Sequence, residues 1–171
     1  IGEPTYVALG KFFRSYYFYN LTLTFGDIPY ASALLGESDQ DYQPAYDDQE
    51  SVFEGILMEL EEANELLAAN NTIIAGDIIY DGDVNSWRKL INAFRLKVLL
   101  TLSEKEGMND GSEFASIYQN EPLMESVEES GQLVFLDQQG NRYPNFNSSS
   151  FSSGMYMDST FIKRLQDRED P

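Results

Sequence analysis

The stretch that decides the fold of this chain is Lys11–Tyr30, "KFFRSYYFYNLTLTFGDIPY", which holds eight of the 23 aromatic residues. Apolar residues recur there and just before it at spacings of three and four, which predicts a helix over residues 5–25. Gly26 can end this helix in a backbone conformation that other residues avoid, and Pro29 follows at the distance where helices stop. A helix with rings on several faces is expected to be buried on two sides, as in a helical array.

The rings of this helix are predicted to be structural core. Exposing most of them would create a large apolar patch, which soluble proteins avoid. In this interpretation the rings pack helices together and do not form a platform for a flat ligand. The residues assigned to the core are Phe12, Phe13, Tyr16, Tyr17 and Phe25.

Two further helices are predicted from their caps and periodicity. The capping box Ser51-Val-Phe-Glu54 begins a helix over residues 51–69, with an apolar stripe and a glutamate-rich wet side. A third helix covers residues 85–105, and its basic side is the natural partner of that acidic helix. Within it, Trp87 and Phe94 are predicted to be core, and Asn92 is predicted to be a hydrogen-bonded structural amide.

The remaining segments give weaker signals. Residues 72–80 are β-branched and short, which fits extended chain or a small hairpin. Residues 112–118 fit a short helix, residues 132–136 fit a strand, and Asp158 can cap a final helix. The fold predicted is mostly α, an antiparallel helix array with long loops and a small β element. It forms a single region over residues 1–171, loop-rich from residue 106 onward.

Charge and composition exclude several classes of function. The net charge is −18, and no Lys or Arg lies between Ser15 and Trp87, whereas 15 Asp and Glu do. Nucleic acids and anionic membrane surfaces are therefore poor partners. The chain has no Cys and no His, which removes disulfides, the commonest general base and most zinc sites. A neutral, polyhydroxylated or cationic ligand stays compatible, and no cofactor is implied.

Residues 31–49 are predicted to form a long surface loop in which tyrosines alternate with carboxylates. Long ordered loops of compact domains are often functional. Tyrosine rings stack on the C–H faces of sugar rings, and carboxylates accept hydrogen bonds from sugar hydroxyls. The alternative is that these rings lie over the core with a wet hydroxyl. The predicted ligand-binding residues are Tyr30, Asp39, Asp41, Tyr42 and Tyr46.

Neither a metal site nor a catalytic site is assigned. Asp81, Asp83 and Asn85 resemble the start of an EF-hand loop, but Ser86 stands where the turn glycine belongs and Asn92 where the bidentate glutamate belongs. A turn and a helix cap are predicted there instead. Paired carboxylates are common enough to allow a two-carboxylate glycosidase. Most of them, however, lie on the wet side of a helix or in the acidic loop.

Several segments, in this order, resemble one family: "FGDIPY", "SVFEGILMELEEANELL", "GDIIYDGDVNSWRKLINAFRLKVLL" and "STFIKRLQDREDP". The chain is similar to the N-terminal half of SusD-like (RagB-like) glycan-binding lipoproteins, over residues 6–105 and again near the C-terminus. The resemblance implies tetratricopeptide-like helix pairs and no enzymatic activity. It also implies a lipid anchor on the outer face of the outer membrane. We therefore expect Ile1 to lie past a lipidated Cys in a longer protein.

The residues and the resemblance together leave three hypotheses about function. The first is a cell-surface component that binds an oligosaccharide for a TonB-dependent importer, with a SusC-like transporter as its partner; a peptide or glycoprotein ligand is a variant of it. The second is a helical scaffold that docks a transporter without a ligand of its own. The third is a glycan-cleaving enzyme.

Overall fold

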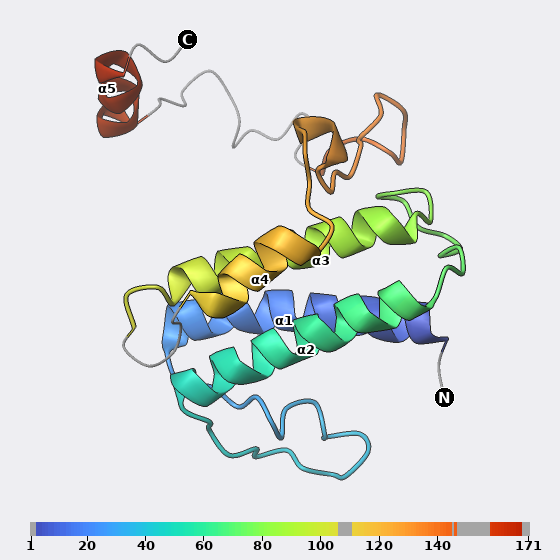
Figure 1. Cartoon of the computed structure of the whole chain (residues 1–171), viewed down its shortest axis with the longest axis vertical. Helices are drawn as coiled ribbons and strands as arrows, with labels where there is room; N and C mark the ends of the chain where they lie inside the picture. The colour runs from blue at the N-terminus through green and yellow to red at the C-terminus, as the bar shows by residue number, and fades with distance from the viewer. Residues whose placement is uncertain (1–2, 106–110, 145, 147–157, 169–171) are drawn as a thin grey trace. The chain divides into compact units, whose positions relative to one another are not determined.

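The structure, a computed structural model, describes residues 3–105, 111–144, 146 and 158–168, and the Asp-Pro at the C-terminus lies outside this part. The chain divides into two compact units, residues 1–132 and 133–171, where the sequence analysis expected one region. Figure 1 labels the helices of both units. They are α1 (Pro4–Phe25), α2 (Gln49–Ala69), α3 (Val84–Thr101), α4 (Ser112–Asn120), the 3-10 helix η1 (Val127–Glu129) and, in the second unit, α5 (Ser159–Asp167).

In the first unit, consecutive helices run antiparallel and lie side by side (Figure 1). α1 packs mainly on α2, α2 packs on α3, and α4 lies against α3. The predicted class, a mostly α antiparallel array, is confirmed. The strand predicted over residues 132–136 is wrong, since Leu136 donates its N–H to the Asn141 carbonyl in a turn at 2.9 Å. Across the described residues, β pairing is limited to an isolated bridge between Ile28 and Asp47.

α1 packs through a seam of mostly small side chains. Its residues follow spacings of three and four, the pattern of two helices in extended contact. Small side chains at four of the six seam positions allow the helix axes to approach closely, and the other two positions carry the rings of Phe12 and Tyr19. The buried seam consists of Thr5, Ala8, Phe12, Ser15, Tyr19 and Thr22.

Several rings of α1 that were predicted to lie in the core are exposed. Phe13 is 40% exposed, Tyr17 62% and Phe25 70%, so none of the three is buried in the described structure. Tyr16 is also exposed, although its ring lies 5.6 Å from that of Phe94. The reason is geometric, because α2 and α3 cover only part of the circumference of α1. Tyr17 and Phe25 lie on the remaining side, whereas the Tyr16 ring and the Phe13 ring, which is 5.9 Å from that of Trp87 in α3, lie at the edge of the covered side.

The buried faces of α2 and α3 agree with their periodicity. All five residues of the predicted α2 stripe are fully buried: Val52, Ile56, Leu60, Ala63 and Leu67. The predicted face of α3 is also buried, with Trp87 at 2% exposure and Phe94 at 7%. α3 ends at Thr101, a few residues before the predicted end.

The caps of α2 and α3 use the same chemistry. The Asp48 carboxylate accepts from the N–H of Ser51 at 2.9 Å and from its hydroxyl at 2.9 Å. Asp83 accepts from the N–H of Ser86 at 2.8 Å and from its hydroxyl at 2.5 Å. The capping-box pattern predicted Ser51 as the cap of α2, and this is wrong. Ser51 is the third residue of the helix. Aspartate takes the cap because its carboxylate also favours the positive end of the helix dipole.

A buried polar cluster joins α2, α3 and the chain after α4. Asn64 accepts from the amide of Asn92 at 3.0 Å and from the guanidinium of Arg88 at 3.2 Å. Arg88 also donates to Glu121 at 3.1 Å, and Asn92 donates to the Pro122 carbonyl at 3.3 Å. Asn92 is fully buried, so these partners offset its desolvation. Residues 121–122 are thereby fixed on the helix pair.

The connection between α2 and α3 is organised by Asp77, a residue that the sequence analysis did not single out. Its carboxylate accepts from the N–H of Ile79 at 2.9 Å, the N–H of Gly82 at 3.0 Å and the indole N–H of Trp87 at 2.7 Å. Gly82 has φ of 87°, and a Cβ there would lie 2.9 Å from the Ile74 carbonyl oxygen, so only glycine fits. Asp77 thus ties the turn to the buried tryptophan.

Phe12 and Phe13 are neighbours that test the position of the seam. Phe12 is 5% exposed and meets the rings of Trp87 and Phe94 at 5.9 and 6.0 Å. We expect Phe12→Ala to lower the free energy of unfolding by about 3–5 kcal/mol, because it leaves a cavity in the core. Phe13→Ala should cost less than half as much. Urea denaturation of both variants measures the difference, and equal losses would contradict the assignment of the seam.

Asp77 is expected to make stability depend on pH. Burial acts to raise the pKa of Asp77, but the hydrogen bonds from Ile79, Trp87, Gly82 and Tyr80 outweigh it, and the pKa lies below its ordinary value. A carboxyl whose pKa is lower in the folded protein stabilises the fold at pH values above its pKa in the unfolded protein, which is about 4. This stabilisation is lost as the pH falls through the pKa of the folded protein.

The Asp77→Asn variant isolates this contribution. At pH 7 it should lower the free energy of unfolding by about 1.5–3 kcal/mol, the range for hydrogen bonds to a charged group. The difference in the free energy of unfolding between this variant and the unchanged protein should shrink between pH 5 and pH 3. Its pH dependence should follow the titration of a single group. Thermal unfolding followed by circular dichroism measures both. A difference that stays constant down to pH 3 would show that Asp77 is not charged in the fold.

Candidate functional site

The acidic loop between α1 and α2 is closed at its base by Asp47. The backbones of Ile28 and Asp47 exchange two hydrogen bonds of 3.2 and 3.0 Å. The Asp47 carboxylate accepts from the N–H groups of Tyr30 and Ala31 at 2.8 and 2.9 Å. Gln49 adds a bond from its side chain to the Thr22 carbonyl at 2.7 Å. The two ends of the loop are therefore held together while the residues between them project from the helices.

Tyr30 belongs to the core and not to the exposed loop, which corrects its prediction as a ligand-binding residue. Its ring packs edge-on against Phe18 at 5.1 Å, and the guanidinium of Arg14 lies 4.2 Å from its centre. A Cβ at position 55 would lie 2.3 Å from the ring, so Gly55 makes room for it. Burial, with the nearby Glu59 carboxylate, raises the pKa of Tyr30 far above its usual range. The hydroxyl stays protonated, and the ring anchors the loop.

Arg14 links this anchor to α2. Its guanidinium donates to the Tyr30 carbonyl at 2.6 Å and to the Glu59 carboxylate at 2.5 Å. Both side chains of this ion pair are more than three quarters buried, so the pair is shielded from solvent. Asp47, Arg14 and Glu59 are positioning residues that the sequence analysis missed. Their partners lie 16 to 45 positions away, and no local pattern connects them.

The tip of the loop presents the other four predicted site residues. Tyr42 is 77% exposed and Tyr46 is 73% exposed. Asp39 accepts from the Ser38 hydroxyl at 2.7 Å, and Asp41 accepts from the N–H of Gln43 at 3.1 Å. Each carboxylate keeps further acceptor positions, because a carboxylate has about four. The loop thus brings exposed rings and hydrogen-bond acceptors together in one segment.

The backbone of the loop tip is held in uncommon conformations. Leu34 has φ of 66° and Gln40 has φ of 58°, a region that residues other than glycine rarely occupy. Leu34 also exposes most of its side chain. The ring of Tyr42 lies against Gly36, where a Cβ would be 3.3 Å away. Backbone strain of this kind gathers at binding and switch segments, although it does not identify a ligand.

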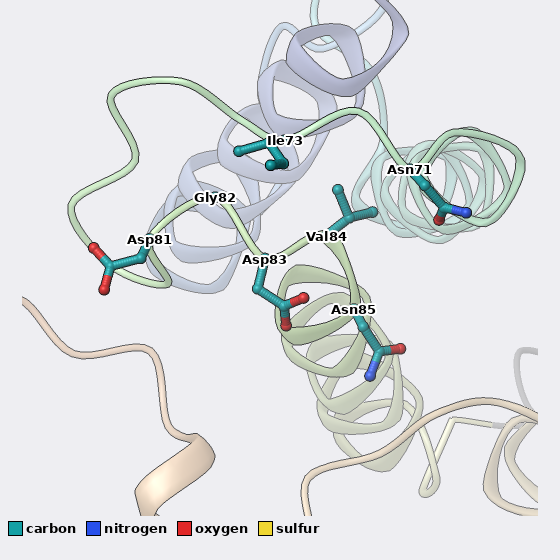
Figure 2. Close-up of a pocket in the computed structure, with 7 residues that line it drawn as sticks. All are labelled: Asn71, Ile73, Asp81, Gly82, Asp83, Val84 and Asn85. Carbon is teal, nitrogen blue, oxygen red and sulfur yellow. The ribbon is translucent and has the colours of Figure 1, made fainter.

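A hollow of about 350 Å³ lies where α2 passes into α3 (Figure 2). Asn71 and Asn85 lie on one side of the view, and Asp81 lies far from them on the other. The polar groups do not converge on one point in Figure 2. The described residues also contain no group of three or more carboxylates that could hold a metal ion. The predicted turn and cap are present instead, with Asp83 as the cap of α3.

Comparison with known proteins gives one family over nearly the whole chain. The model of the SusD-like family with the description "Starch-binding associating with outer membrane" matches residues 2–171. A crystal structure of a SusD homologue from Bacteroides fragilis NCTC 9343 is 58% identical, with a TM-score of 0.87, over 98% of this chain and 36% of its own. None of the curated proteins matches the chain.

Two further structures extend the comparison. An outer membrane protein from Bacteroides vulgatus ATCC 8482, described in connection with nutrient binding, is 56% identical with a TM-score of 0.90, over 100% of this chain and 38% of its own. A chitin-binding protein is 27% identical with a TM-score of 0.78, over 96% of this chain and 34% of its own. The chain therefore spans less than two fifths of the length of these structures. None of the described helices has the length and hydropathy needed to cross a membrane.

Asp47 can be tested as the clasp of the loop. Trypsin has no target between Arg14 and Arg88, but a glutamate-specific protease can cut after Glu37 in the loop. We expect Asp47→Ala to speed this cut several-fold, because loops are cleaved through local opening. Mass spectrometry of timed digests measures the rate. Asp41→Ala, whose carboxylate bonds only within the tip, is the matched control, and equal rates for both variants would contradict the role of Asp47.

Proposed function

The chain belongs to the SusD-like family of starch-binding proteins that associate with the outer membrane, and on this premise we propose that it is a non-catalytic, glycan-binding part of a nutrient importer. The ligand is an oligosaccharide, bound at the tip of the loop between α1 and α2. The observation that supports this best is the exposure of Tyr42 and Tyr46 on a loop whose base is fixed by Asp47.

Binding at this loop needs no bond to be made or broken. The exposed tyrosine rings stack on the C–H faces of pyranose rings, and their hydroxyls stay in contact with water. Asp39 and Asp41 accept hydrogen bonds from the sugar hydroxyls. A loop that is already closed at its base loses less conformational freedom when it binds, and this favours affinity.

The charge pattern favours a neutral ligand. Between Ser15 and Trp87 the chain has no Lys or Arg, so an anionic glycan would meet only carboxylates on this loop. The carboxylates of α2, by contrast, are partly matched by cations of neighbouring helices: Lys11 pairs with Glu62 at 2.6 Å and Arg95 with Glu61 at 3.2 Å. The loop carboxylates have no such cation among the described residues, and they remain available to hydroxyls.

The wider assembly is also part of the proposal. We place the protein on the outer face of the outer membrane, held by an N-terminal lipid of a longer chain, beside a SusC-like TonB-dependent transporter that receives the oligosaccharide. This rests on the family membership. The scaffold hypothesis, in which the protein docks a transporter without a ligand, and the glycosidase hypothesis are outcomes that the binding experiment below separates.

The experiment is calorimetric titration with maltohexaose, a starch fragment, and with chitohexaose, since one relative is a chitin-binding protein. Saturable heat with either oligosaccharide supports the proposal. Release of shorter products during incubation would favour the glycosidase. Absence of heat with both oligosaccharides, together with co-purification with a transporter, would favour the scaffold.

Tyr42→Ala is the variant that tests the loop. We expect about a tenfold loss of affinity, equal to about 1.4 kcal/mol, with an unchanged thermal midpoint, because the ring packs on little besides Gly36. Tyr17→Ala removes a ring of similar exposure from α1 and should leave the affinity unchanged. If Tyr42→Ala unfolds the protein while the affinity of the folded fraction is unchanged, the loop is not the binding site.

A further inference from the structure

A second hollow, of about 420 Å³, lies where α3 and α4 meet the chain that follows α4. Its wall is formed by Lys89 of α3, Tyr118 of α4 and residues 121–125 that follow α4. Its volume falls in the range of about 300–1,000 Å³ that is usual for small-molecule sites. It shares no residue with the loop between α1 and α2. We call it the Tyr118 hollow.

Tyr118 provides a free aromatic face at this hollow. The ring is 68% exposed, whereas its neighbour Ile117 is the buried residue that holds α4 on the array. The described structure gives the Tyr118 ring no aromatic or hydrogen-bonding partner. The fold therefore does not need this ring, and its face is available to the C–H face of a sugar ring.

Two of the three charged groups of the hollow, Glu121 and Lys89, are fixed and already compensated, and the third, Glu125, forms no ion pair among the described residues. Glu121 accepts from Arg88 and from the Asn64 amide, both at 3.1 Å, and these contacts belong to the buried polar cluster of α2 and α3. Lys89 forms an ion pair with Glu129 of η1. Glu121 keeps free acceptor positions and the Lys89 ammonium keeps free donors, because each has more hydrogen-bonding positions than its partners use. Since Glu121 and Lys89 are paired and Glu125 would repel an anion, a neutral ligand with hydroxyl groups fits better than an anionic one.

The backbone of the hollow offers further hydrogen-bonding groups. The segment is extended, with the Pro122 carbonyl bonded to Asn92 and the N–H of Glu125 bonded to Glu129 at 2.7 Å. Between these two anchors, the N–H and C=O groups of Leu123 and Met124 have no partner among the described residues. Half-buried backbone groups of this kind need hydrogen bonds from water or from a ligand.

We propose that the Tyr118 hollow is a second glycan-contact site, which takes one neutral sugar ring of a bound oligosaccharide or of another chain of the same polysaccharide. The sugar ring stacks on Tyr118, and its hydroxyls bond to Glu121, Lys89 and the free backbone of residues 123–124. The proposal rests on the proposed glycan-binding function. It adds a site that neither the loop nor the family description assigns, and two sites per molecule would raise avidity for a polymeric glycan.

The test is fluorine NMR of the chain with its 11 tyrosines replaced by 3-fluorotyrosine, titrated with maltotriose and with chitotriose. The resonances of Tyr118 and Tyr42 are assigned from the Tyr118→Phe and Tyr42→Phe variants. We expect both resonances to shift saturably, each with its own midpoint, and calorimetry to find two binding events per molecule.

Variants at position 118 complete the test. Tyr118→Ala should reduce the binding events from two to one and leave the midpoint of the Tyr42 shift unchanged, while Tyr118→Phe, which keeps the ring face, should retain both events. A Tyr118 resonance that stays fixed while the Tyr42 resonance moves overturns this inference and leaves the proposed function standing. If neither resonance moves with either trisaccharide, both proposals fail. If only the Tyr118 resonance moves, the inference is supported and the loop assignment is wrong.

Discussion

The close approach of α1 to α2 is the constraint on which the rest of this structure depends. It requires small side chains along one line of α1, and Thr5, Ala8, Ser15 and Thr22 provide them. Most of that line is occupied by small residues, and of the α1 rings only Phe12 and Tyr19 lie on it. Phe12 packs toward α3, with its ring 6.0 Å from that of Phe94, and the rings of Tyr17 and Phe25 are left exposed.

The connections between the helices depend on single carboxylates. Asp47 closes the loop after α1, and Asp77 organises the chain between α2 and α3. Asp48 and Asp83 begin the helices that follow. In each case the carboxylate accepts from backbone N–H groups that would otherwise lack partners. Part of the strong negative charge of the chain therefore serves to define the fold, and it does not all indicate a charged ligand.

The two candidate glycan sites share one physical arrangement. Each presents a tyrosine ring that the fold leaves exposed, beside carboxylates whose positions are fixed by hydrogen bonds. At the loop the supporting contacts lie at its base and join residues 16 to 45 positions apart; at the Tyr118 hollow they come from the buried cluster of α2 and α3. This arrangement suits weak, reversible binding of neutral sugars, because it needs neither net charge nor a catalytic pair.

The sequence by itself determined the helices, their order and the polar loop, because amphipathic periodicity and turn residues are local properties. It also placed Tyr42 and Tyr46 on an exposed segment. Only the tertiary structure decided which rings are buried: Tyr30 is enclosed by Arg14, Phe18 and Gly55, whereas four rings assigned to the core are exposed. The reason is that a helix with rings on all faces has no preferred side until its small-residue line meets a neighbouring helix, and such contacts join residues far apart in the chain.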